Sequence, residues 1–208
     1  MLSHVKSLLS SVPMYVGLQK AVGAHRVRYL ALERLNLQDG DVILDVGCGP
    51  AYYFDRLPNV KYYGFDTSER YIEHARKNFG DRGSFRCEIF TEEHLPELPP
   101  VDKVILMGLL HHLTDDQCRH LLDLSARVLA PTGEVCSIDP TFEPNQNPIA
   151  KWMSSNDRGE HVRQPEGFVA LAKESFGDIE GEIVNDVTRV PTTTWLMRMR
   201  KPLVAAES

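Results

Sequence analysis

The sequence predicts an α/β protein with a doubly wound, mostly parallel sheet and helices on both faces. Three apolar runs, at 42–46, 61–65 and 101–107, have the length and composition of buried strands. Segments with helical periodicity follow them, at 69–79 and 115–129. Because strands that alternate with helices pair in parallel through crossover connections, this order favours a parallel sheet covered on both sides.

Each predicted helix has its own sequence signals. Residues 17–35 form an amphipathic pattern ahead of the first strand. Ser68 is a suitable N-cap for the helix that ends at Gly80. Thr114 and Gln117 have the spacing of a capping box, and an apolar stripe follows them as far as Leu129.

The pattern changes after Asp139. Three prolines, at 140, 144 and 148, break regular structure over about ten residues. A short helix is predicted at 149–153 and another from Gln164 through Phe176, and the segments 178–187 and 193–200 read as an antiparallel pair. Since open α/β sheets bind ligands at the carboxyl ends of their strands, the segment 139–163 is predicted to line a substrate site.

The chain of 208 residues is predicted to be a single domain. Within it we distinguish an N-terminal helical segment (1–38), a cofactor-binding core (40–140), a substrate-site loop (140–165) and a final helix with antiparallel strands (165–201).

Composition narrows the class of protein. The net charge of −6 and the pI near 5.7 argue against a nucleic-acid partner. No apolar window has the length of a membrane helix, and the first residues lack the features of a secretion signal. The four cysteines show no C-x-x-C spacing, which favours reduced thiols. We therefore expect a cytoplasmic monomer or homodimer that acts on a small molecule, with no membrane partner.

The most informative segment runs from Val42 to Pro50. An apolar strand ends in Asp45 and continues into a turn with Gly47 and Gly49. Glycines at such a turn allow a ligand to approach the main chain closely. A dinucleotide fingerprint would place glycine or alanine at the sixth position, where this chain has Tyr52, so a nicotinamide cofactor is disfavoured.

Four motifs in order give the chain a family resemblance. They are the Asp45-x-Gly47-x-Gly49-x-Ala51 turn, Asp66 after the second strand, the segment 101–113 with paired histidines, and the segment 127–135. Together they resemble class I S-adenosylmethionine (SAM) dependent methyltransferases, although that family prefers glycine at position 51. The resemblance implies a seven-stranded sheet whose last strand is inserted beside the fifth, with SAM as cofactor and S-adenosylhomocysteine as product.

The resemblance also implies roles in cofactor binding. Asp45 would face the methionine ammonium of SAM, and Asp66 would accept from both ribose hydroxyls. Asp45 could instead cap the turn, and Asp66 could cap the following helix. Tyr15 and Gln19 could close over the cofactor, with a packed tyrosine and a solvated glutamine as the alternative. The full predicted set is Asp45, Gly47, Cys48, Gly49, Ala51, Asp66, Thr67, Glu88, Ile89, Met107, Gly108, Tyr15 and Gln19.

Two histidines are candidate general bases. A neutral imidazole accepts a proton near pH 7, so His111 or His161 could deprotonate the acceptor. The polar cluster 156–163 is either a solvated loop or a substrate-binding segment. Candidate substrate residues are Trp152, Arg158 and Arg163. No bound metal is expected, because a set made of His111, Asp115 and Cys118 lacks a fourth ligand.

The sequence thus favours a transferase that carries out SAM-dependent methylation at O or N of a small molecule. The main catalytic device would be positioning for in-line displacement. Two alternatives stay open: a non-catalytic SAM-fold binding or regulatory protein, and, less favoured, a nicotinamide oxidoreductase.

Overall fold

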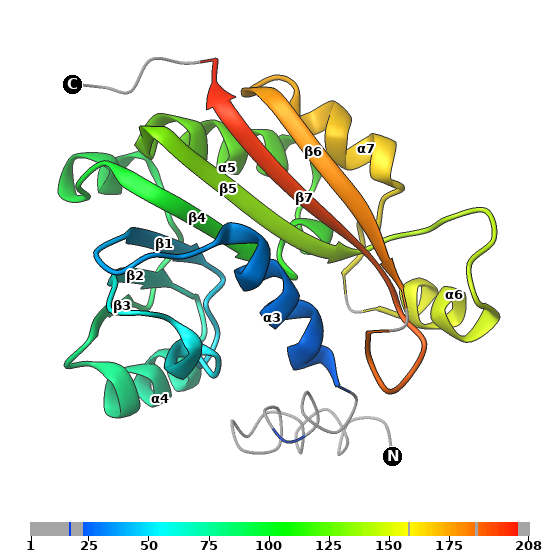
Figure 1. The fold of residues 1–208 in the computed structure, drawn as a ribbon, viewed down its shortest axis with the longest axis horizontal. Helices are drawn as coiled ribbons and strands as arrows, with labels where there is room; N and C mark the ends of the chain where they lie inside the picture. Colours follow the sequence, from blue (N-terminus) through cyan, green and yellow to red (C-terminus); the bar gives the residue numbers. More distant parts are fainter. Residues whose placement is uncertain (1–16, 18–22, 158, 186, 204–208) are drawn as a thin grey trace.

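The computed structural model describes residues 17, 23–157, 159–185 and 187–203. Within them the chain forms a seven-stranded sheet in the order β3-β2-β1-β4-β5-β7-β6 (Figure 1). The strands are β1 (Val42–Val46), β2 (Lys61–Phe65), β3 (Gly83–Arg86), β4 (Val101–Met107), β5 (Leu129–Pro140), β6 (Phe176–Asn185) and β7 (Thr193–Pro202).

The strand pairing confirms the predicted doubly wound sheet. Strands β1 to β5 pair in parallel, whereas β7 lies antiparallel between β5 and β6. In this register Ile138 of β5 faces Leu196 of β7, and both side chains are buried. The last strand is therefore inserted beside the fifth, and its first residues lie next to the carboxyl end of β5.

Helices cover both faces of the sheet. Helices α3 (Ala24–Leu35) and α4 (Glu69–Phe79) pack on one face, in an apolar cluster with β1 and β2. On the other face, α5 (Asp115–Val128) and α7 (Pro165–Ala172) share a second cluster with the same strands (Figure 1). Helix α6 (Pro148–Ser155) and three short 3₁₀ helices, η1 (Phe54–Arg56), η2 (Glu92–Glu97) and η3 (Leu110–His112), lie in connections.

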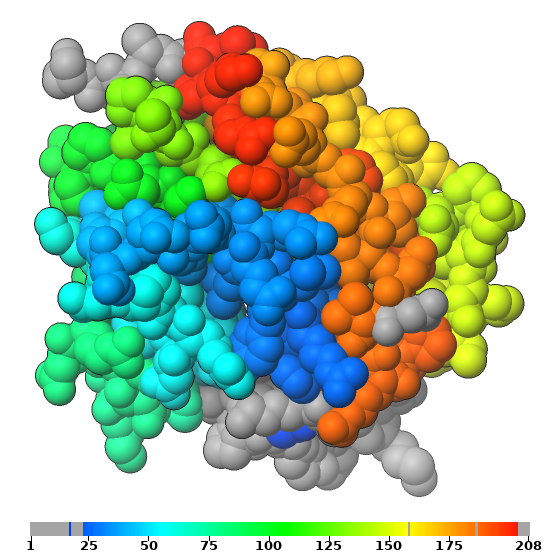
Figure 2. Space-filling model, in the orientation of Figure 1, coloured from blue at the N-terminus to red at the C-terminus, as the bar shows by residue number. Residues whose placement is uncertain are grey.

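Helix α3 begins against the connection between β6 and β7. It follows Gly23, whose φ of 81° is unfavourable for other residues, and a Cβ there would lie 2.9 Å from the backbone nitrogen of Arg189. Figure 2 accordingly shows α3 in the middle of this face, beside the orange segment that contains the β6–β7 connection. The predicted helix 17–35 is found from Ala24, and residues 18–22 lie outside the described part.

The local signals of the other helices were informative to different degrees. The Thr114 capping box is present, with Thr114 and Gln117 bonding each other's backbone N–H groups. Ser68 precedes α4 as predicted but makes no side-chain cap. The helix predicted to run through Phe176 ends at Ala172, because Phe176 is buried as the first residue of β6.

The structure bears on two features of the composition, the cysteines and the length of the apolar segments. All four cysteines are free; Cys48, Cys118 and Cys136 are buried, whereas Cys87 is exposed. Among the described helices, none is both long and apolar enough to cross a bilayer.

Candidate functional site

The glycine turn lies at the carboxyl end of β1. Gly47 and Cys48 donate their backbone N–H groups to the carbonyl of Phe65, at 2.8 and 3.1 Å, which ties the turn to the end of β2. Gly47 and Gly49 have φ values of 78° and 56°, in the left-handed region. A Cβ placed on Gly49 would meet no atom within 4 Å, so open space lies directly against the backbone there.

Asp66 holds this turn from the end of β2. Its Oδ2 accepts from the Gly49 N–H at 2.9 Å and its Oδ1 from the Ser68 N–H at 2.8 Å. The residue is partly exposed, and each carboxylate oxygen has a second lone pair beyond the bond described. Asp66 therefore has a structural role and retains the capacity to accept from a ligand.

Asp45 lies beneath the turn and is fully buried. Its Oδ2 accepts from the hydroxyls of Tyr53 and Tyr62, the latter at 2.5 Å, whereas its Oδ1 has no partner. Burial raises the pKa of Asp45 and the two tyrosine hydrogen bonds lower it, with a result of about 6. A buried acid with one unoccupied oxygen thus supports the floor of the turn.

Ala51 explains why this position favours glycine. Its φ is 51° and it is fully buried, so an L-residue occupies a left-handed conformation inside the core. The small methyl group is tolerated there, whereas a branched side chain would be strongly disfavoured.

A cavity of about 550 Å³ opens at the carboxyl ends of β4 and β5. Gly108, which has a φ of 69°, follows β4 and lines the cavity. Its backbone N–H donates to the carbonyl of Ile138 at 2.8 Å. The walls come from α3, α6, the end of β5 and the start of β7. They include the apolar residues Val27, Ile138, Trp152 and Met153 and the polar residues Arg28, His111, His112, Asp139, Asp157, Thr188, Thr192 and Thr194.

His111 is held between two carboxylates at one end of this cavity. Its Nδ1 lies 2.8 Å from Asp139 Oδ1, and its Nε2 lies 3.1 Å from Asp157 Oδ1. Burial lowers the pKa of His111, but the hydrogen bonds and charges of Asp139 and Asp157 outweigh burial and raise it to about 9. His111 is therefore an imidazolium near neutral pH, with both ring nitrogens acting as donors.

Comparison with known proteins shows which family the stretch around the glycine turn belongs to. Residues 43–133 match the family model described as "Methyltransferase domain", and this stretch contains the glycine turn, Asp66 and His111. The chain contains a class I SAM-dependent methyltransferase domain. SAM is the cofactor of this domain class.

Individual relatives of the methyltransferase domain differ in acceptor. The chain is 28% identical over 121 residues to cyclopropane mycolic acid synthase 3 of Mycobacterium tuberculosis, covering 55% of this chain and 42% of that protein. It is 28% identical over 176 residues to the tRNA U34 carboxymethyltransferase of Vibrio cholerae, covering 77% of this chain and 53% of that protein. The chain thus spans about half the length of these curated relatives.

A solved structure has the same fold over most of this chain. The N-methyltransferase NodS from Bradyrhizobium japonicum WM9 superimposes with a TM-score of 0.65 at 19% identity, covering 86% of this chain and 96% of that one. At this identity the likeness concerns the fold alone.

The residues of the methyltransferase domain fit SAM at its polar end. The unpartnered Oδ1 of Asp45, the spare lone pairs of Asp66 and the open space at Gly49 are what a polar ligand at a glycine turn requires. On the predicted adenine side, Ile89 is 69% exposed and Thr67 and Glu88 are also exposed. Glu88 forms weak ion pairs with Arg86 and His94, at 3.7 and 3.4 Å.

Only some of the other predicted site residues lie at the cavity. Trp152 and Gly108 line the cavity, whereas Met107, Cys48 and Ala51 are buried beside it or beneath the turn. Tyr15, Gln19 and Arg158 lie outside the described residues.

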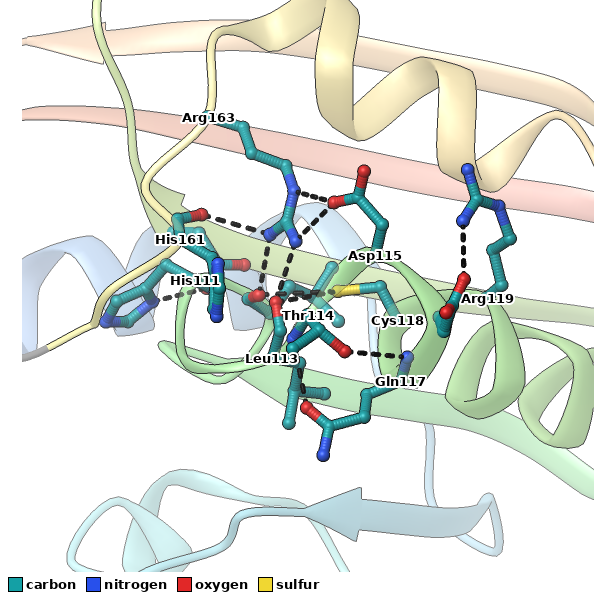
Figure 3. Close-up of polar contacts among 12 residues, drawn as sticks. His111, Leu113, Thr114, Asp115, Gln117, Cys118, Arg119, His161 and Arg163 are labelled. Atoms are coloured by element: carbon teal, nitrogen blue, oxygen red, sulfur yellow. Dashed lines mark hydrogen bonds and ion pairs between the residues drawn. The ribbon is translucent and has the colours of Figure 1, made fainter.

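Arg163 and His161 hold the η3 loop and do not line the cavity. The Arg163 guanidinium donates to the carbonyls of Leu110, Leu113 and His161 and to Asp115, at 2.7 to 3.0 Å (Figure 3). The His161 N–H donates to the His111 carbonyl at 3.0 Å. Neither side chain is part of the cavity lining, so the structure places both as a clamp on the η3 loop rather than next to the cavity.

One group of potential metal ligands is present in the described part of the methyltransferase. The ligand atoms of His111, His112 and Asp157 lie within 4.8 Å of one another. The direct ion pair between His111 and Asp157 accounts for this proximity, and we assign no metal to it. Asp115 and Cys118 are engaged elsewhere, with Arg163 and the Leu110 carbonyl.

Sequence analysis did not single out Arg28, Asp139 or Asp157 as site residues. Arg28 lies on α3 with its guanidinium carbon 5.5 Å from the centre of the Tyr52 ring. Asp139 lies at the carboxyl end of β5. An acid at the end of a buried strand was the sequence feature that could have indicated a site residue. Asp157 belonged to a polar cluster in which nothing distinguished it from its neighbours.

The state of His111 gives a testable pH dependence. Because its folded pKa of about 9 exceeds the ordinary value near 6.5, its contribution to stability is complete below pH 6.5 and is lost as the pH rises through 9. We expect a nuclear magnetic resonance titration of the His111 ring to have a midpoint near 9 and Asp157→Asn to lower that midpoint by one unit or more. A midpoint below 7 in the wild-type protein would contradict the geometry.

Proposed function

We propose that this protein is an enzyme that transfers the methyl group of SAM to an oxygen or nitrogen of a small molecule. The observation that supports this most directly is the position of the 550 Å³ cavity. Gly108 lines it and directly follows β4, the strand that pairs with β1 and therefore lies beside the glycine turn. A cavity of that volume suits a drug-sized molecule, and it opens where α/β sheets bind their ligands.

The protein's contribution is mainly positioning. When bound, SAM supplies an activated methyl group on a sulfonium. Asp66 would accept from the ribose hydroxyls while it keeps the Gly49 turn in place, and Asp45 would present its unpartnered Oδ1 toward the ammonium side. Thr67, Glu88 and Ile89 would contact the adenine. Holding the reactants in line and in contact can lower the barrier by about 7 to 11 kcal/mol.

Arg28 is proposed as the partner of the SAM carboxylate. It lines the cavity, and its Nη2 lies 3.6 Å from the position that a Cβ would take on Gly108. Its charge also lowers the pKa of Asp45, which indicates that it lies near the turn. A guanidinium at this place matches a carboxylate in geometry and charge.

Replacing Arg28 by glutamine tests this role. We expect the affinity for SAM and S-adenosylhomocysteine to fall by about 10-fold to 100-fold, because a charge-assisted hydrogen bond contributes roughly 1.5–3 kcal/mol. The affinity for 5′-methylthioadenosine, which lacks the carboxylate, should change by less than a factor of two. Equal losses for all three ligands in calorimetric titrations would show that Arg28 only supports the fold.

The remaining features agree with a small-molecule enzyme. The net charge of −6 disfavours a nucleic-acid acceptor, although a relative's name refers to a tRNA. We further propose a cytoplasmic protein that is a monomer or homodimer, which size-exclusion chromatography with light scattering would check. A non-catalytic binding protein is the remaining alternative, and turnover distinguishes it.

The experiment that tests the proposal is calorimetric titration with SAM, S-adenosylhomocysteine and NAD, followed by an acceptor screen that measures S-adenosylhomocysteine release. Micromolar binding of both adenosyl ligands, with none for NAD, is expected. Binding of NAD alone would favour an oxidoreductase. Adenosyl binding with no turnover over a broad panel would favour the non-catalytic alternative.

A further inference from the structure

Asp139 is a buried carboxylate that lines the cavity together with Gly108. It follows Ile138, whose carbonyl accepts from the Gly108 N–H, so it lies at the point where cofactor and acceptor would meet. The residue is 1% exposed. Its Oδ1 accepts from His111 Nδ1 at 2.8 Å and from the His111 backbone N–H at 3.2 Å.

The second oxygen of Asp139 has no partner among the described residues. Its Oδ2 is buried and accepts no hydrogen bond from that part of the chain. Among the described residues that line the cavity, it is the one buried side-chain oxygen or nitrogen left in this state. Leaving a buried acceptor unsatisfied costs about 1–3 kcal/mol, more for a charged group, so a donor from a bound molecule would be strongly favoured there.

The neighbouring groups cannot fill the same role. Both ring nitrogens of His111 are bonded to carboxylates, so neither offers a lone pair. Asp157 Oδ1 accepts from His111 and also from the Gly159 N–H at 2.8 Å. His111 therefore acts as a fixed cation that orients Asp139. The Asp157 side chain is 35% exposed, so its second oxygen is open to solvent, whereas Asp139 Oδ2 is buried in the cavity lining.

We propose that Asp139 Oδ2 receives the O–H group of a hydroxyl acceptor and takes its proton during methyl transfer. This inference rests on the proposed methyltransferase function and names the class of acceptor. As the acceptor oxygen forms its bond to the methyl carbon, the bond from that carbon to sulfur breaks and its electron pair stays on sulfur, which becomes a neutral thioether. The acceptor proton moves to Asp139, which leaves a methyl ether, S-adenosylhomocysteine and a carboxylic acid.

The chemistry of a carboxylate favours a hydroxyl over an amine. A hydroxyl becomes an oxonium as its oxygen is methylated, and an oxonium is a far stronger acid than a carboxylic acid. A carboxylate is therefore a sufficient base for it. An alkylammonium, by contrast, has a pKa about six units above that of a carboxylic acid, so a carboxylate is a poor base for releasing the amine lone pair.

The rest of the cavity fits such an acceptor. Ile138, Trp152 and Met153 give it an apolar side, and Thr188 and Thr192 add hydroxyl groups on another. A small molecule with an apolar body and one or more hydroxyls would satisfy both. Trp152 is 66% exposed in the protein alone, so stacking on a bound ring would bury a large apolar surface.

Matched probes test the proposal without knowledge of the natural acceptor. Benzyl alcohol and benzylamine, and cyclohexanol and cyclohexylamine, differ only in the reacting group. Each would be titrated into protein saturated with S-adenosylhomocysteine, with Trp fluorescence and calorimetry as readouts, and then assayed for turnover with SAM. We expect the alcohols to bind and to be the members that are methylated, because an amine held as an ammonium at the carboxylate has no lone pair for the methyl carbon.

Three variants separate recognition from structural support. Asp139→Asn keeps an acceptor for His111 but loses the carboxylate, so alcohol binding should fall at least tenfold and any alcohol turnover by about 100-fold or more. Asp157→Asn makes the same change at the other partner of His111, and it should retain the methylation of alcohols. Asp123→Asn changes an exposed carboxylate on α5 and should behave as the wild type. Thermal unfolding and SAM titration accompany each variant.

Several outcomes would overturn the proposal. They are methylation of the amines, unchanged alcohol affinity in Asp139→Asn, equal effects of Asp139→Asn and Asp157→Asn on alcohol binding and turnover, or no alcohol binding up to solubility. Failure of the wild-type protein to bind SAM would instead contradict the proposed function, so the two failures are distinguishable.

Discussion

Replacing Asp66 by alanine is expected to weaken SAM binding at least about 100-fold. The substitution removes the carboxylate proposed to hold the ribose, and two bonds to a charged acceptor contribute about 1.5–3 kcal/mol each. It also removes the acceptors of the Gly49 and Ser68 N–H groups, which frees the glycine turn from the end of β2. Calorimetric titration with SAM measures the combined effect.

Asp55→Ala provides the matched control. Asp55 lies close along the chain on η1, its side chain is 75% exposed, and its ion pair with Arg82 at 3.7 Å is at the surface. Such pairs contribute little, so SAM affinity should stay within a factor of two. If Asp66→Ala binds SAM as well as this control does, Asp66 is only a turn-stabilising residue and the proposed ribose site is wrong.

Replacing Asp45 by alanine is expected to lower the free energy of unfolding by about 3 kcal/mol near pH 4.5. The loss follows because the hydroxyls of Tyr53 and Tyr62 both donate to Asp45 in the core and would be left unpaired. Urea unfolding at fixed pH gives the value. Asp123→Ala, at an exposed site on α5, should change it by less than about 0.5 kcal/mol.

The effect of Asp45 should shrink as the pH rises. Its folded pKa of about 6 lies above the ordinary value of 3.8, so the folded state binds the proton more tightly and wild-type stability falls as the pH rises from about 4 to 6. The alanine variant lacks this loss. We expect the difference in free energy of unfolding between the wild type and Asp45→Ala to decrease by about 2 kcal/mol between pH 4.5 and 7.5. A gap that stays constant or widens would mean that Asp45 is ionised throughout.

The sequence was most informative where local chemistry and position coincide. The turn at Gly47 and Gly49 could be predicted because those residues take left-handed conformations that a Cβ disfavours. The insertion of β7 beside β5 followed from the family resemblance, because this pairing joins residues as far apart as Glu134 and Arg200. The glycine turn, by contrast, depends on residues close together in the chain, which is why a single sequence is sufficient to predict it.

The acceptor site could not be predicted in the same way. His111 looked like a free base because its two carboxylate partners are 28 and 46 positions away along the chain. Arg163 looked like a substrate residue, yet its guanidinium is bonded to carbonyls that a folded loop brings to it. Arg28 reaches the cavity only because α3 packs against the sheet. Such roles depend on contacts between distant segments.

The origin of the cavity walls has a consequence for how such proteins diversify. Of the lining residues, only Gly108, His111 and His112 fall within the matched stretch 43–133; the others come from before it or after it. The proposed cofactor residues and the cavity walls therefore come mostly from different segments of the chain, within one sheet and one core. Exchange of the outer segments could change the acceptor while the proposed cofactor residues stay intact, which would allow one ancestral core to serve acceptors as different as those in the relatives' names.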